Sequence, residues 1–199
     1  MFALIFGLSF LANAQDVQKD QPKGYQFTDI KRLPATSVKD QARAGTCWSW
    51  SGISFFESEM IRMGKEPIDL SAMYIVRHAY SDKATKFVRL HGSMNFAVGG
   101  AFCDVMHVIK NYGIVPMDVY MGLNYGEPNH AFGEIDDVLA GYINAVIKNS
   151  NKKLSTAWKK GFDGILDAYL GEEPEKFEYK GKEYTPRTFA DEVVGWHKS

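Results

Sequence analysis

Cys47 and Gln41 have the residue types and the spacing that a thiol nucleophile needs. Cys47 follows Thr46, a residue type that often caps a helix, so the sequence predicts a thiol at a helix N-terminus. Unpaired backbone N–H groups and the helix dipole favour the thiolate there, and the thiolate is the nucleophilic form. Gln41 lies six residues earlier and can turn its amide toward the same point. The pair predicts an attacking sulfur and a hydrogen-bond donor for an oxyanion.

The helix that would position Cys47 is expected to run to about Met63, with Gly64 just past its end. Apolar and small side chains recur around much of this segment, which is typical of a buried central helix. Glu57 and Glu59 are expected to mark its solvated end.

The remainder of the chain is predicted to be mostly helical, with little sheet. Hydrophobic periodicity and capping residues predict further helices. Three start near Ser71, after Gly99-Gly100 and at Thr185-Pro186, and two more span 136–147 and 156–170. A small β-hairpin is expected in residues 177–184.

The N-terminal residues are typical of a secretory signal. Residues 1–11 are almost wholly apolar, and Ala12 and Ala14 place small side chains where a signal peptidase reads them. This predicts a signal peptide over 1–14, an extended leader over 15–33 and an exported protein, periplasmic or secreted. The apolar run is shorter than the ~20 residues that span a membrane, so no membrane association is expected after cleavage.

The charge and the cysteine count exclude several kinds of site. A formal net charge of -1 gives no reason to expect nucleic acid as a partner. Two cysteines, with no histidine at ligand spacing, cannot build a zinc site, and no metal or cofactor is expected. Cys103 is expected to be a buried thiol with no chemical role, and no disulfide with Cys47 is expected.

The pattern Gln-x5-Cys-Trp, entering a long helix, resembles the active-site segment of papain-like cysteine peptidases. Gly99-Gly100 and the helix after them are similar to the family segment that pairs with the substrate backbone. Ala44 stands where the general papain pattern has a cysteine. That difference, a long helical insertion after residue 120 and the segment 185–190 resemble the bleomycin hydrolase and aminopeptidase C branch.

This resemblance implies an α+β papain-like fold, of which the chain is mainly the helical half, with a helical insertion and a small hairpin. It implies one domain over 34–199, incomplete at its C-terminus. Cys47 would be the nucleophile, Gln41 the oxyanion donor, and Gly99 and Gly100 contacts to the substrate backbone. The activity implied is that of an aminopeptidase or oligopeptidase acting on peptides.

A thiol peptidase also needs a histidine base and a residue that orients it. No histidine of this chain is followed by an Asn-Ser-Trp-like segment, as the family pattern would require; the five are His78, His91, His107, His130 and His197. A downstream or separate chain is therefore expected to carry the His and Asn. Three interpretations remain: a peptidase completed by that half, an inactive relic or interaction module of the same fold, and a thiol used in transfer or redox chemistry.

Overall fold

The structure is a computed structural model that describes residues 24, 25 and 27–196. The chain forms two units, residues 1–33 and 34–199. The predicted signal peptide, 1–14, lies outside the described residues and stays a prediction. The described part of the predicted leader contains no helix or strand.

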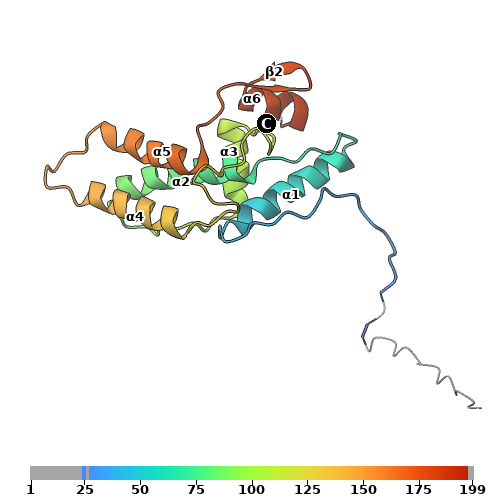
Figure 1. Cartoon of the computed structure of the whole chain (residues 1–199), viewed down its shortest axis with the longest axis horizontal. Helices are drawn as coiled ribbons and strands as arrows, with labels where there is room; N and C mark the ends of the chain where they lie inside the picture. The colour runs from blue at the N-terminus through green and yellow to red at the C-terminus, as the bar shows by residue number, and fades with distance from the viewer. Residues whose placement is uncertain (1–23, 26, 197–199) are drawn as a thin grey trace, which may run out of the picture. The chain divides into compact units, whose positions relative to one another are not determined.

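Helices dominate the unit that begins at Pro34 (Figure 1). They are α1 (Cys47–Arg62), α2 (Ala72–Arg89), α3 (Phe102–Tyr112), α4 (Gly133–Ile147), α5 (Ala157–Leu170) and α6 (Pro186–Phe189), which continues into a π-helical turn, η1 (Ala190–Val194). Strands β1 (Phe177–Tyr179) and β2 (Lys182–Tyr184) form one antiparallel hairpin, in which Phe177 pairs with Tyr184. The predicted helices and hairpin are thus present. Among the described residues, no helix is both long and apolar enough to cross a membrane.

Helix α2 is the centre of the core. The hydroxyl of Ser71 accepts a hydrogen bond from Tyr74 N at 3.0 Å, so Ser71 caps α2; the sequence is compatible with either Asp69 or Ser71 in this role. α1 and α3 pack on α2, and so do α4 and α5 of the insertion (Figure 1). Because α2 is covered from several sides, its side chains are buried along most of its length, each apolar one contributing roughly 1.5–3 kcal/mol.

Helix α1 is buried on one face only. Ile53 and Met60 lie in the core, whereas Cys47, Ser51 and Phe55 are exposed. The expectation of a buried central helix is therefore wrong for the face that carries Cys47. Small and hydroxyl-bearing side chains occupy much of that face and can be solvated, and no element of residues 34–196 covers it.

Glu57 is fully buried, so its predicted place at a solvated helix end is wrong. On α1 it is four residues after Ile53 and three before Met60, and it therefore shares their inward face. The main-chain N–H of Leu70 donates to its Oε1 at 2.8 Å. Lys39 Nζ and the Thr36 hydroxyl donate to its Oε2. These partners satisfy a carboxylate that would otherwise be costly to bury.

His78 is buried within α2 and lies against the ring of Tyr112, with 4.1 Å between ring centroids. The neighbouring Arg77 is also buried and pairs with Asp167 and Glu173, which ties α2 to the insertion. Burial, and then the positive charges of Arg77 and Lys159, lower the pKa of His78 to about 3. The imidazole is therefore neutral in the folded protein at neutral pH.

This lowered pKa predicts a loss of stability in mild acid. The unfolded chain takes up a proton at His78 below pH ~6.5, but the folded chain does so only near pH 3, so stability falls as the pH drops between these values. Between pH 6 and 4.5 we expect the wild type to lose about 1–2 kcal/mol more than His78→Phe, which keeps a ring against Tyr112. Glu173 Oε2, 3.6 Å from His78 Nε2, would reduce this difference. Urea unfolding of both proteins across that pH range tests this prediction. If the free energy of unfolding falls equally with pH in the wild type and in His78→Phe, His78 is not neutral in the folded protein.

Candidate active site

Cys47 is the first residue of α1, and its side chain is exposed. Thr46 occupies the N-cap position, but its hydroxyl does not accept from the first turn; it accepts from Trp50 Nε1 at 3.0 Å. The Thr46 carbonyl accepts from Ser49 N at 2.9 Å, but the Thr46 side chain leaves the N–H groups of Cys47 and Trp48 uncapped. As the first residue of α1, Cys47 lies at the positive end of the helix dipole.

Gln41 and Cys47 line the same groove, which has a volume of about 450 Å³. The groove runs between the extended segment 35–41 and the exposed face of α1, with Trp50, Ser51 and Ser54 in its wall. Gln41 Oε1 is buried without a hydrogen-bond partner. The structure thus places the predicted thiol and the predicted amide donor in the walls of one groove.

The turn between these two residues depends on Gly45. It has φ +66°, a left-handed conformation in which glycine carries no steric penalty. A Cβ there would also lie 3.2 Å from Val98 Cγ1. The loop is further held by Arg43, whose N–H donates to His130 O at 2.9 Å and whose carbonyl accepts from Phe132 N at 3.2 Å.

Gly99 and Gly100 lie beside Trp48, the residue after Cys47. A Cβ on Gly100 would come within 2.5 Å of the Trp48 ring, so only glycine fits without displacement. Trp48 Nε1 donates to Val98 O at 3.0 Å, and Lys83 Nζ donates to Gly99 O. Gly99 is exposed, and nothing lies within 4 Å of the position its Cβ would take. Gly99 is therefore accessible at the surface, although its carbonyl already accepts from Lys83 Nζ.

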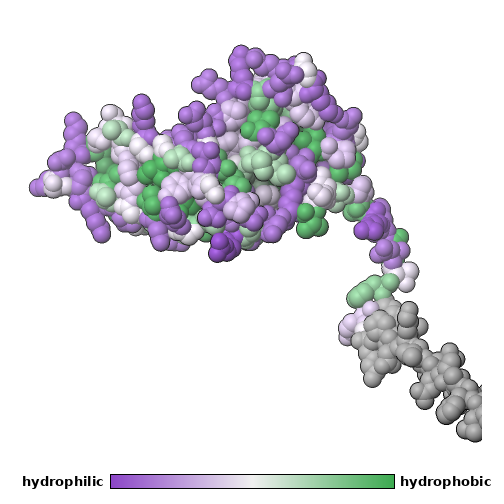
Figure 2. Space-filling model, viewed as in Figure 1, coloured by the Kyte–Doolittle hydropathy of each residue, from purple (hydrophilic) through white to green (hydrophobic). Residues whose placement is uncertain are grey.

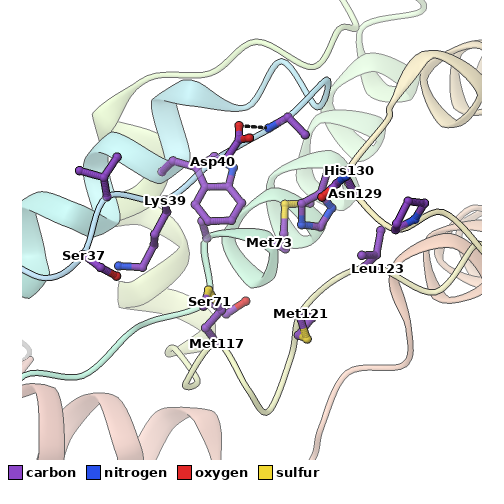
Figure 3. A pocket seen from close by; sticks show the side chains of 15 residues that line it. Ser37, Lys39, Asp40, Ser71, Met73, Met117, Met121, Leu123, Asn129 and His130 are labelled. Carbon is purple, nitrogen blue, oxygen red and sulfur yellow. Dashed lines mark hydrogen bonds between the residues drawn. The ribbon is translucent and has the colours of Figure 1, made fainter.

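A second hollow, of about 330 Å³, shares Ser37, Val38, Lys39 and Trp50 with the groove. Figure 3 shows Ser37, Lys39 and Asp40 on one side of it, and Leu123 and His130 on the other. His130 is buried, and burial lowers its pKa. The segment that carries Gln41 thus has open space on both of its faces.

No histidine among residues 34–196 lines the groove with Cys47. His78 and His130 are buried elsewhere. His91 is exposed in the turn after α2, and His107 is exposed on α3. His197 lies outside the described residues. Within the described ranges there is also no group of three or more side chains that could hold a metal ion.

Cys103 is exposed, and the expectation that it is buried is wrong. Val105 and Val108 form the buried side of α3, and Cys103 precedes Val105 by two residues, about 200° around the helix. Both cysteines are free thiols.

Comparison with known proteins identifies the family. A model described as "Papain family cysteine protease" matches residues 22–158. The chain belongs to the papain family of cysteine proteases. Among solved structures, PepW from Lactobacillus rhamnosis HN001 is similar, with a TM-score of 0.58 and 21% sequence identity, over 83% of this chain and 45% of that chain. This papain-family chain therefore spans less than half the length of PepW. No curated protein sequence matches it.

The papain-like fold that the sequence motif implied is confirmed. The sequence interpretation missed Glu57 and its contact with Lys39. Helical spacing with Ile53 and Met60 was the signal that could have placed Glu57 in the interior.

Proposed function

We propose that the complete enzyme is a cysteine peptidase in which Cys47 attacks the carbonyl carbon of a peptide bond. The single observation that carries this is the shared groove of Cys47 and Gln41 at the start of α1. Family membership supports the same chemistry.

In the first step the Cys47 sulfur forms a bond to the carbonyl carbon, and the carbonyl oxygen takes the negative charge. Gln41 Nε2 and the Cys47 backbone N–H donate to that oxygen. A base takes the proton of the Cys47 thiol as the sulfur attacks. The intermediate then collapses as the C–N bond breaks, and the protonated base gives that proton to the leaving amine. Water then hydrolyses the thioester, which releases the acid and the thiol.

The base comes, in this proposal, from a part of the complete enzyme that carries the His and Asn. The exposed face of α1 supports the idea that such a part packs against this chain. Phe55 and Phe102 are 52% and 42% exposed, and their rings lie 5.4 Å apart across α1 and α3. Figure 2 shows apolar residues open to solvent among charged ones around these helices. Large exposed apolar side chains in contact with each other are typical of surfaces that another body covers.

We further propose that the enzyme belongs to the bleomycin hydrolase and aminopeptidase C branch and acts on peptides as an exported aminopeptidase. Ala44, which is buried where the general papain pattern has a cysteine, supports the branch. So does the insertion that supplies α4 and α5, since both pack on α2. The apolar residues 1–11 support export.

Cleavage of a fluorogenic peptide by the longest encoded form of the protein tests the proposal. Cys47→Ala is expected to abolish turnover. Cys103→Ala, which removes the other exposed thiol, is expected to retain it. Normal cleavage by the Cys47 variant would exclude the thiol mechanism. Absence of cleavage by the wild type would favour an inactive relic or interaction module.

A further inference from the structure

The segment that carries Gln41 is tethered to the rest of the domain two residues earlier, through Lys39. Lys39 Nζ lies 2.8 Å from Glu57 Oε2 and 2.7 Å from Asp69 Oδ1. Burial lowers the pKa of Lys39, but the hydrogen bonds to Asp69 and Glu57 outweigh it and raise the pKa overall. The ammonium is therefore charged at neutral pH, and it joins the segment to α1 and to the loop leading into α2.

Glu57 is the centre of this network. Its side chain is 0% exposed, and it receives bonds from Lys39, from the Thr36 hydroxyl and from Leu70 N. Asp69, by contrast, is 45% exposed, so its pair with Lys39 is weakened by solvent. Removing one member of a buried ion pair is costly, because it leaves the other charge buried without a partner. Loss of the Lys39–Glu57 contact is therefore expected to cost more than loss of the Lys39–Asp69 contact.

After Gln41 the backbone is held, because Ala44 N donates to Gln41 O at 3.2 Å and Arg43 bonds to His130 and Phe132. Before Gln41, the side-chain bonds that join residues 35–40 to the rest of the domain go to Glu57 and Asp69. The groove with Cys47 opens on one face of this segment and the second hollow on the other, and Val38 is fully exposed. On the N-terminal side of Gln41, the charged contacts of Lys39 therefore fix the segment against α1.

Lys39 and Gln41 both line the groove with Cys47, as residues two apart on an extended segment should when they point to the same side. Glu57 lies on α1, ten residues after Cys47, about 15 Å along the same rigid helix. Cys47 lies at the N-terminal end of α1, and Glu57, which binds Lys39 of the segment that carries Gln41, lies further along the same helix. Helix α1 therefore determines the positions of both the thiol and that segment.

We propose that Glu57 and Lys39 are positioning residues that hold the Gln41 amide over Cys47. The pair touches no reacting atom and acts through Gln41. This inference rests on the proposed function, because it takes the Gln41 amide as the oxyanion donor.

The test compares two reagents on the complete enzyme. A peptide aldehyde forms a hemithioacetal: the Cys47 sulfur bonds to the aldehyde carbon, and the thiol proton passes to the oxygen, which occupies the oxyanion site. Iodoacetamide alkylates the sulfur by displacing iodide and needs no oxyanion donor. A loss of aldehyde affinity without a loss of alkylation rate therefore reports on the oxyanion site and the peptide-binding groove, and not on the thiol itself.

Glu57→Gln and Lys39→Met are expected to weaken aldehyde binding about tenfold or more and to leave the alkylation rate unchanged. Lys39→Arg is expected to restore binding, because it keeps the charge. Glu59→Gln is the matched control, an acid on the same helix that pairs only with Arg62 at the surface, and it should change neither reaction. Adding Glu57→Gln to Gln41→Ala should cause no further loss, since both act through one amide.

If Gln41→Ala weakens aldehyde binding but folded Lys39→Met and Glu57→Gln do not, the positioning role is wrong and the proposed function stands. An unaltered aldehyde affinity in Gln41→Ala would instead remove the oxyanion donor from the proposed function. Equal losses with both reagents, or an equal loss in Glu59→Gln, would mean a general structural effect and would overturn the inference.

Discussion

Replacing Gln41 with alanine is expected to lower kcat for peptide cleavage about 100- to 1,000-fold and to change KM little. Gln41 shares the groove with Cys47, and its Nε2 is the donor atom of its amide. Its hydrogen bond is strongest to the negative oxygen of the transition state and weaker to the neutral carbonyl of the bound peptide. Losing it should therefore affect turnover more than binding.

Two variants separate this effect from a change in the groove. Gln41→Glu keeps the shape of the side chain but cannot donate when ionised, and it should be as slow as the alanine variant. Ser54→Ala removes a hydroxyl from the same groove and should leave kcat unchanged. Wild-type kcat in Gln41→Ala would mean that the amide does not stabilise the oxyanion.

Gly113→Ala is expected to destabilise the domain by about 3–5 kcal/mol. A Cβ there would lie 2.3 Å from Pro186 O and 2.6 Å from Arg187 N, both backbone atoms that cannot move aside as a side chain does. Gly113 also has φ +92° and ψ -156°, a conformation essentially restricted to glycine. It ends α3 where Ile114 N donates to Pro186 O at 3.1 Å, so the clash would separate α6 from α3.

Urea unfolding gives the measurement, and Gly141→Ala gives the control. Gly141 lies inside α4 with nothing within 4 Å of its Cβ position, so alanine should stabilise the domain by about 0.5–1 kcal/mol. Equal unfolding midpoints for Gly113→Ala and the wild type would contradict the tight approach of α6 to α3.

Local signals were sufficient to predict most of the fold. Ser71 caps α2 as its position before an apolar helix suggests, and the hairpin forms where aromatic and polar residues alternate around Gly181. Glu57 was misplaced because a charged residue is exposed by default, and its partners, Lys39 and the Leu70 N–H, are distant in sequence. Helix and burial propensities of single residues do not predict contacts between residues that are distant in sequence.

The proximity of Gln41 and Cys47 was predictable, because a six-residue loop with Gly45 at positive φ can return an amide to the start of a helix. The capping bond expected of Thr46 is absent, since its hydroxyl binds the Trp50 ring nitrogen. The requirement for glycine at position 100 comes from the Trp48 ring beneath it. That is a tertiary contact, and sequence spacing alone does not reveal it.

Labelling of the two exposed thiols tests the central claim most directly. The complete enzyme is treated with limiting peptidyl epoxide or with iodoacetamide, and the modified cysteines are mapped by mass spectrometry. Cys103 is the internal control, since it is also free and exposed, near the start of α3. If Cys47 is the nucleophile of a peptide site, the epoxide will modify Cys47 almost alone, whereas iodoacetamide will modify both. Equal epoxide labelling of the two, or a preference for Cys103, would contradict the account.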